Sequence, residues 1–183
     1  MLKRIMAICA AAVVGVMPLA GQSWAAPGET TAPNGQLIAR WVSEKPMVTK
    51  AVAPGWTRLA SASATTDCWT VDHPVRALSF LGTTIYVYHQ KLSWCEDGSR
   101  ITNIYDRFDY ISEKSSVAFP SDNRAVDMQF ASGNGSASQM SRRIDLCVVN
   151  GGCYASNLPW SKITVYPEAG RSPRYQLEGN AIS

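Results

Sequence analysis

The stretch from Thr83 to Tyr110 constrains the fold most, because it predicts a β-hairpin. Residues 83–95 are mainly β-branched and aromatic, residues 101–110 have the same character, and Asp97-Gly98 lies between the two runs. An Asp-Gly pair in this setting is one of the strongest local signals for a hairpin. Further candidate strands are residues 116–119, 125–130, 142–149 and 162–166, with residues 132–136 as an exposed loop. The pattern predicts an all-β domain, either an antiparallel β-sandwich or a partly open barrel.

The amino terminus has the order of a secretory signal peptide. Residues 1–4 are basic, an apolar run covers residues 5–20, and Ser23-Trp24-Ala25 supplies the small residues of a cleavage site. The apolar run is shorter than the roughly 20 residues that a membrane span needs. We therefore predict that residues 1–25 are removed, that the mature protein is secreted and extracellular, and that it has no membrane span.

The charge of the chain argues against a nucleic-acid partner. The whole sequence has 17 Lys and Arg against 14 Asp and Glu, a formal charge of +3. Loss of residues 1–25 removes Lys3 and Arg4 and no acid, which leaves a charge of +1 on the mature chain. Proteins that follow a phosphate backbone carry a much stronger basic footprint. We expect no nucleic acid among the partners.

Residues 26–66 differ in composition from the rest of the mature chain. They are rich in Ala, Thr, Pro and Ser, and such segments rarely bury enough surface to order themselves. Residues 37–42 place Leu, Ile, Trp and Val at helical spacing, and Pro46 would end a short helix there. We predict a flexible or partly helical N-terminal segment at 26–66, followed by a disulfide-stabilised β domain at 67–183.

Four cysteines remain after the signal peptide: Cys68, Cys95, Cys147 and Cys153. An even number in an exported chain predicts two disulfides, with three possible connectivities, and the spacing does not suit a structural zinc site. Cys147 and Cys153 lie symmetrically about Asn150, so a three- or five-residue hairpin loop with a glycine at positive φ would bring them together. We therefore predict the pairs Cys147–Cys153 and Cys68–Cys95.

These cysteines and their neighbours carry a resemblance that spans about residues 67–168. The matching positions are Cys68-Trp69, Trp94-Cys95, Asp97-Gly98-Ser99-Arg100-Ile101, Cys147, Gly152-Cys153, Pro159-Trp160 and Ile163-Thr164-Val165-Tyr166. Together they resemble a group of small secreted β proteins of actinobacteria, most of which are described as hypothetical. The resemblance implies export and two disulfides, and it implies no activity.

One histidine lies near a carboxylate in the predicted hairpin. Counting outward from a two-residue turn at Asp97-Gly98 places His89 opposite Asp106. A His–carboxylate pair can orient a general base for a serine nucleophile. Ser93, the only serine on that face of its own strand, is four residues and therefore roughly 13 Å from His89. We interpret the pair as a surface or half-buried ion pair.

The sequence also gives little support for a metal site or for the paired catalytic acids of a glycosidase. Asp72-His73 and His89 could begin a metal site, but the chain has only two histidines and no close ligand spacing. The acids that a glycosidase would pair across a cleft are instead concentrated in one hairpin, where we expect them to face solvent: Glu96, Asp97, Asp106 and Asp109. The sequence predicts no catalytic residue, no metal site and no cofactor.

The strand before Cys95 carries a row of aromatic residues. If Cys95 is buried, alternation turns Ile85 and Val87 inward and leaves Tyr86, Tyr88 and Trp94 on the opposite face. An exposed aromatic row stacks on sugar rings or contacts a protein partner. The interpretation we favour over such a platform is core packing, in which another strand layer or the N-terminal segment covers the row, or a bulge swaps the two faces. We name Tyr86, Tyr88 and Trp94 as the candidate binding face.

These observations favour a secreted, non-enzymatic, monomeric protein that binds an unknown extracellular polymer or protein. A secreted hydrolase that acts on wall or environmental polymers is one alternative, and a secreted antimicrobial or inhibitor protein is another. The three differ in what the surface must show: an exposed aromatic patch for binding, a polar cleft with converging titratable groups for catalysis, and a protruding rigid loop for inhibition.

Overall fold

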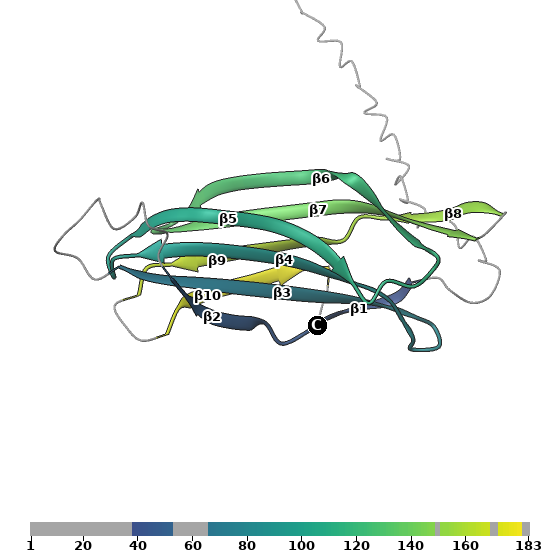
Figure 1. The fold of residues 1–183 in the computed structure, drawn as a ribbon, viewed down its shortest axis with the longest axis horizontal. Coiled ribbons are helices and arrows are strands. Elements are labelled where there is room, and N and C mark those ends of the chain that lie inside the picture. The colour runs from purple at the N-terminus through teal and green to yellow at the C-terminus, as the bar shows by residue number, and fades with distance from the viewer. Residues whose placement is uncertain (1–37, 53–65, 149–150, 169–171, 181–183) are drawn as a thin grey trace, which may run out of the picture.

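The computed structural model describes residues 38–52, 66–148, 151–168 and 172–180. These residues form two stacked antiparallel β-sheets, as Figure 1 shows, so the predicted all-β sandwich architecture is confirmed. The described part of the chain has no helix that could cross a bilayer. The predicted signal peptide at 1–25 lies outside the described residues.

The first sheet is built on a meander of three long strands, β3 (Asp67–Ser79), β4 (Thr84–Glu96) and β5 (Ile101–Ser112). Two short strands, β1 (Ile38–Ser43) and β2 (Met47–Ala51), both pair with the free side of β3, one after the other along its length. The order is therefore β1 and β2, then β3, β4 and β5. The first sheet places β4 in its interior and β5 at its edge.

The second sheet has the order β10-β9-β7-β6, and β8 pairs with the far end of β7. Its strands are β6 (Ala118–Ser132), β7 (Gly135–Val148), β8 (Gly152–Asn157), β9 (Trp160–Tyr166) and β10 (Arg174–Gly179). A two-residue turn at Gly133-Asn134 joins β6 to β7, and Gly133 has a φ of 59° at its first position. Glycine suits that position because a side chain there would be strained.

The core lies between the two sheets as two adjoining apolar clusters. One is built around Tyr86, Tyr88, Ile144 and Leu146, and the other around Trp94, Leu92, Ile163 and Val165. The alternating residues of strands in both sheets meet there, as in other sandwiches with a core about 10 Å thick.

Both predicted disulfides are confirmed. Cys68–Cys95 joins β3 to β4, and Cys147–Cys153 joins β7 to β8 across a loop in which Gly152 has a φ of 74°. All four thiols are therefore oxidised, which removes the zinc alternative. The chain-entropy model assigns about 3.6 kcal/mol to the first link and about 2.4 kcal/mol to the second. Disulfides of this kind are typical of proteins that fold in an oxidising compartment.

The helix predicted before Pro46 is wrong. Residues 38–43 form β1, in which Trp41 and Val42 pair with Ala77 and Arg76 of β3. A short run of apolar residues fits both the helical and the strand periodicity. Here the run is extended because it pairs with the open edge of β3. The β domain therefore reaches back beyond the predicted boundary at 67 to at least residue 38.

The prediction of an exposed binding face is also wrong. Tyr86, Tyr88 and Trp94 are each 0% exposed and pack against the second sheet. The alternation argument assumed that β4 has one buried face, whereas Ile85, Val87 and Cys95 on its other face are buried as well. Burial of Cys95 therefore does not require the aromatic row to face outward, and the row lies between the two sheets as part of the core.

The hairpin between β4 and β5 has a longer loop than Asp97-Gly98 alone predicts. Asp97 Oδ1 accepts hydrogen bonds from the backbone N–H groups of Ser99 and Arg100, at 3.0 Å each. This Asx-type turn makes a four-residue loop, so Glu96 pairs with Ile101. Two register shifts follow along the ladder, and they bring Tyr110 rather than Asp106 opposite His89.

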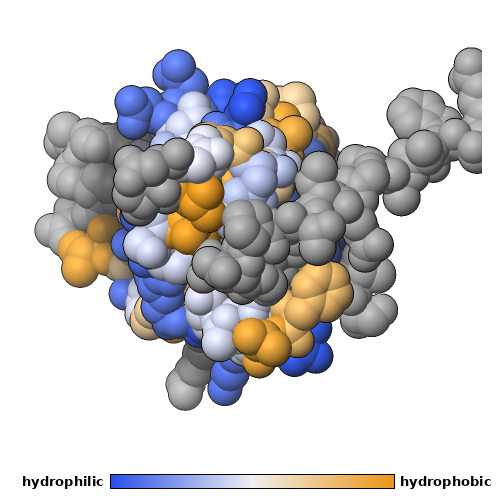
Figure 2. All heavy atoms as spheres, turned by 90° about the vertical axis from the view of Figure 1, so that its right-hand side faces the viewer, coloured by the Kyte–Doolittle hydropathy of each residue, from blue (hydrophilic) through white to orange (hydrophobic). Residues whose placement is uncertain are grey.

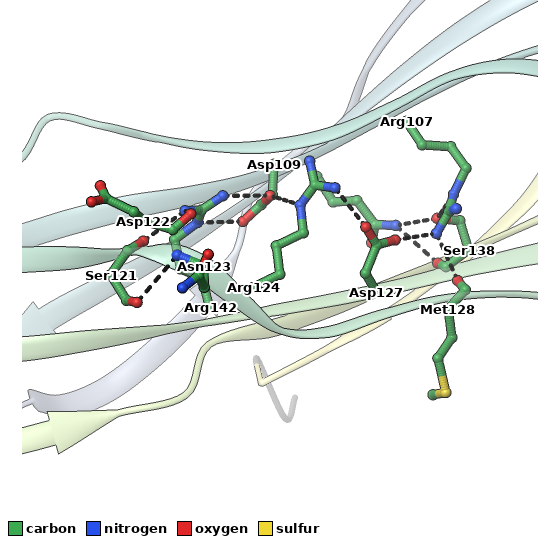
Figure 3. Close-up of polar contacts among 11 residues, drawn as sticks. Arg107, Asp109, Ser121, Asp122, Asn123, Arg124, Asp127, Met128, Ser138 and Arg142 are labelled. Carbon is green, nitrogen blue, oxygen red and sulfur yellow. Dashed lines mark hydrogen bonds and ion pairs between the residues drawn. The ribbon is translucent and has the colours of Figure 1, made fainter.

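An ion-pair network joins the edge of the first sheet to the second (Figure 3). Asp109 of β5, with a side chain 0% exposed, binds Nε of Arg124 at 2.5 Å and Nε of Arg142 at 2.7 Å. Arg107 of β5 binds Asp127 of β6 at 2.6 Å. The expectation that the hairpin carboxylates all face solvent is thus wrong for Asp109, which ties the two sheets together. It is also wrong for Glu96, which is 2% exposed and accepts a hydrogen bond from the backbone N–H of Glu168.

Candidate functional site

The outer face of the first sheet carries a group of polar side chains from three neighbouring strands. Asp72 lies on β3, His89 on β4, and Tyr110 and Ser112 on β5. Val71, next to Asp72 on β3, and Leu92, three residues from His89 on β4, point into the core. Because side chains alternate between the two faces of a strand, Asp72 and His89 lie on the outer face. His89 pairs with Tyr110, and Ser112 is its diagonal neighbour two residues further along β5.

His89 links a carboxylate to a serine. Its Nδ1 lies 2.9 Å from Oδ1 of Asp72, and its Nε2 lies 2.7 Å from Oγ of Ser112. An ionised carboxylate only accepts hydrogen bonds, so we assign the proton of neutral His89 to Nδ1. Nε2 then accepts the hydroxyl proton of Ser112. This is the arrangement of a nucleophile, a general base and an orienting acid in a Ser-His-Asp triad.

Asp72 is held in its ionised form. Burial by itself raises the pKa of Asp72, but the hydrogen bonds from His89 and Tyr110 outweigh burial, and the net result is a lowered pKa. A charged Asp72 favours a positive charge on the neighbouring imidazole. The carboxylate can therefore orient His89 and stabilise it when it takes up a proton.

Tyr110 supports both members of this pair. Its hydroxyl donates to Oδ2 of Asp72 at 2.5 Å, and its ring stacks on His89 with centroids 4.3 Å apart and planes 13° from parallel. Burial and the hydrogen bond to Asp72 raise the pKa of Tyr110 to about 12. Tyr110 therefore remains a donor at neutral pH and fixes the second oxygen of the carboxylate.

A pocket of about 250 Å³ opens beside the serine and the histidine. Pro74 and Val87 are the buried apolar residues of its lining, while Met47 is 64% exposed at its rim. Lys45 is an exposed residue of the same lining. The remaining lining residues are Glu44, Asp72, His89, Ser112 and Glu113.

Arg76 binds both glutamates of the pocket. Its guanidinium forms ion pairs with Glu44, just after β1, and with Glu113, just after β5. These hydrogen bonds raise the pKa of Arg76 above its ordinary value, and the Arg76 hydrogen bond lowers the pKa of Glu113. One guanidinium offsets one of the two carboxylates, so this group of three residues keeps one negative charge.

The backbone turns sharply directly after Ser112. Glu113 has a φ of 48° and is the only non-glycine among the described residues with a positive φ. Such a conformation is unfavourable for a residue with a side chain, and strained residues of this kind cluster at functional sites. In serine hydrolases of the α/β-hydrolase fold the nucleophile itself occupies a sharp, strained turn after a strand, whereas here the strained residue follows Ser112.

The second histidine has a different environment. His73 Nε2 lies 2.9 Å from Oγ of Ser43, and its Nδ1 lies 2.7 Å from Oγ of Ser161 on β9. Burial lowers the pKa of His73 to about 4, so it is neutral over the physiological range. His73 thus joins the two sheets through the hydroxyl of Ser161 and contacts Ser43 within its own sheet, and no carboxylate of the described residues is hydrogen-bonded to its ring.

Sequence reasoning placed the site in the wrong part of the molecule. The three aromatic residues of the candidate binding face are in the core, and the four cysteines are structural links. His89 was singled out, but with the wrong partner, and Ser112 was missed. A four-residue loop alone would place Phe108 opposite His89, and the two register shifts along the ladder are also needed to make Ser112 its diagonal neighbour. The turn chemistry of Asp97 could have indicated the longer loop, but the sequence gives no signal for the two shifts.

Exposed apolar residues do not offer a replacement for the lost aromatic face. Figure 2 shows one end of the sandwich, where hydrophobic residues are interspersed with hydrophilic ones. Phe80 and Leu81 are exposed in the β3–β4 turn, and Phe119 is half exposed on β6. The exposed hydrophobic residues are thus spread over separate elements, and the pocket at Ser112 remains the most specific chemical feature.

Comparison of the chain with family models, with curated proteins and with solved structures found no match. The functional argument therefore rests on the geometry of the pocket and of the Asp72–His89–Ser112 group.

Proposed function

We propose that this protein is a secreted hydrolase that cleaves esters with Ser112 as the nucleophile. The hydrogen-bonded chain from Asp72 through His89 to Ser112, at the wall of a pocket, is the observation that carries the proposal. The non-enzymatic binding protein that the sequence favours needed an exposed aromatic patch. A polar pocket with converging titratable groups instead supports the hydrolase alternative.

The extracellular setting has two independent supports. The basic, apolar and small-residue order of residues 1–25 is that of a signal peptide. The disulfides Cys68–Cys95 and Cys147–Cys153 suit an oxidising compartment. A secreted hydrolase would meet esters of the cell wall or of environmental polymers.

In the first half of the reaction, Oγ of Ser112 attacks the ester carbonyl carbon while its proton passes to Nε2 of His89. Asp72 stabilises the imidazolium that forms. The tetrahedral intermediate then expels the alcohol oxygen, which takes the proton from Nε2 and leaves as the alcohol. The product is an ester of the acyl group with Ser112.

In the second half, water attacks the acyl carbon while His89 accepts its proton. Collapse of the second intermediate returns this proton to Oγ of Ser112 and releases the carboxylic acid. The sum is ester and water converted to acid and alcohol, with the enzyme restored. No other reactant is required.

Each tetrahedral intermediate carries a negative oxygen that needs stabilisation. Arg76 is committed to Glu44 and Glu113, so it is a poor donor for a further anion. We assign this role to the ammonium group of Lys45, an exposed residue of the pocket lining. Removal of one such donor in other hydrolases lowers kcat by about 10²–10³.

Hydrolysis of p-nitrophenyl acetate by the purified mature protein tests the proposal. Ser112→Ala should lower kcat/KM by about 10³-fold or more, to the background rate. Ser43→Ala is the matched control, because it also removes a serine hydroxyl hydrogen-bonded to a histidine Nε2, at 2.9 Å. Circular dichroism melts show that each variant is folded. Equal rates for the wild type and Ser112→Ala would refute the assignment.

A further inference from the structure

We infer that the pocket beside Ser112 accepts a short acyl chain, so that the substrates are esters of small carboxylic acids of about two to four carbons with the alcohol part outside the pocket. The inference rests on the proposed ester hydrolysis and adds the acyl specificity of the same site.

The volume of the pocket sets the upper limit. It measures about 250 Å³, below the roughly 300–1,000 Å³ of pockets that hold drug-sized ligands. A cavity of about 150 Å³ holds benzene, so the space beside Ser112 suits about ten non-hydrogen atoms. An acid of about two to four carbons has about four to six non-hydrogen atoms and fits within that number, whereas octanoate would take up all of it. A fatty acyl chain of twelve or more carbons does not fit.

The walls of the pocket favour an apolar chain of limited length. Pro74 and Val87 are buried in the sheet and present carbon atoms beside the catalytic group. Contact with them removes a methyl or propyl group from water, which favours binding of a short apolar chain.

The Arg76 ion pairs restrict the space beyond these carbons. Glu44 and Glu113 line the pocket on the sides of β1 and β5, and Arg76 binds both of them. A longer chain would have to displace water from these charged groups without replacing their hydrogen bonds, which is unfavourable. The acyl chain therefore ends at the Arg76 ion pairs.

The alcohol part of the ester meets fewer restrictions. Ser112 is half-buried at the end of β5, and Met47 and Lys45 of the pocket lining are exposed. A leaving alcohol that is part of a large molecule can thus remain in solvent. Short acyl groups attached to a polymer hydroxyl fit this division.

The test is a chain-length series with the wild-type protein: the p-nitrophenyl esters of acetate, butyrate, octanoate and laurate. We expect kcat/KM to be highest for acetate or butyrate and at least about tenfold lower for octanoate. Val87→Ala enlarges the pocket and should raise the octanoate-to-acetate ratio, whereas Phe119→Ala, at a half-exposed residue on β6 outside the pocket lining, should leave the ratio unchanged.

The outcomes separate the two proposals. Hydrolysis that depends on Ser112 but is as fast for octanoate or laurate as for acetate overturns the acyl specificity and leaves the proposed function standing. Absence of Ser112-dependent hydrolysis for every ester overturns both. The wild-type series decides the matter even if Val87→Ala does not fold.

Discussion

Asp109 should be one of the most important single residues for stability, and Asp109→Ala tests this. Its side chain is 0% exposed. The carboxylate accepts hydrogen bonds from Nε of Arg124, from Nε of Arg142 at 2.7 Å, and from a second nitrogen of Arg142 at 2.9 Å. Its removal leaves two partly buried guanidinium groups without that partner. Loss of one member of a buried ion pair costs about 3–5 kcal/mol.

The lower end of that range applies here. Arg124 keeps its ion pair with Asp127 at 2.6 Å, and Arg142 keeps the backbone carbonyl of Ser121 at 2.6 Å. We therefore expect Asp109→Ala to lower the free energy of unfolding by about 3 kcal/mol. With a urea m-value of about 2 kcal/mol/M, the unfolding midpoint should fall by about 1.5 M.

Urea unfolding at pH 7, followed by tryptophan fluorescence, measures this change. Asp106→Ala is the matched control, because Asp106 lies on the same strand and is exposed, and its loss should change stability by no more than about 0.5 kcal/mol. A loss below about 1 kcal/mol for Asp109→Ala, or one no larger than that of the control, would refute the inter-sheet role of Asp109.

The same residue predicts a pH dependence. Burial by itself raises the pKa of Asp109, but the hydrogen bonds from Arg142 and Arg124 outweigh burial and set the pKa below the ordinary value of 3.8. The carboxylate therefore stabilises the fold at all pH values above about 4, and this contribution is lost as the pH falls below 3.8 through the pKa of the folded state. The stability difference between the wild type and Asp109→Asn should accordingly shrink below pH 4, as measured by urea unfolding at several pH values.

Three further changes test the core, the disulfides and the pocket. Tyr86→Ser should lower the free energy of unfolding in urea by about 3–5 kcal/mol because Tyr86 is fully buried. Phe80→Ser, at a residue 64% exposed, should change it little. An unchanged stability of Tyr86→Ser would contradict the burial of Tyr86 in the core. The double variant Cys68→Ala/Cys95→Ala should lose up to about 3.6 kcal/mol, and unchanged stability would contradict the chain-entropy estimate. Lys45→Met should lower kcat/KM for p-nitrophenyl acetate by about 10²-fold with no change in melting temperature, and an unchanged kcat/KM would remove Lys45 from the mechanism.

The architecture and the disulfides could be predicted because they follow from local patterns. Alternating β-branched residues between turn signals define strands, and the symmetry of Cys147 and Cys153 about Asn150 requires a hairpin that joins them. The pair Cys68–Cys95 then follows by exclusion. None of these steps depends on how distant strands meet.

The site could not be predicted because it depends on register. The Asx-type turn at Asp97 adds two residues to the loop, and the register shifts in β5 then bring Tyr110 opposite His89. A single-residue error in register moves a side chain to the other face of a sheet. Asp72 comes from a third strand, and its contact with His89 is visible only when the sheet is assembled.

Burial of the aromatic row as part of the core was one of the two interpretations that the sequence allowed, and the structure confirms it. The sequence shows alternation along one strand, but it does not show which face of β4 meets the second sheet. The residues of both faces of β4 near Tyr86 are buried, so burial of Cys95 could not decide the orientation. Tyr86 and Tyr88 belong to the core although Val87 between them is buried too.

The most direct test of the proposed nucleophile is covalent labelling with a fluorophosphonate probe, followed by peptide mass spectrometry. An activated serine oxygen displaces fluoride from the phosphorus atom and keeps the phosphonyl group. We predict one modified serine, Ser112, in the wild-type protein, and strongly reduced labelling in Asp72→Asn, which leaves His89 without its carboxylate. Ser43 should remain unmodified, since no carboxylate is hydrogen-bonded to its partner His73. An unmodified Ser112, or labelling of Ser43 to the same extent, would contradict a Ser-His-Asp hydrolase.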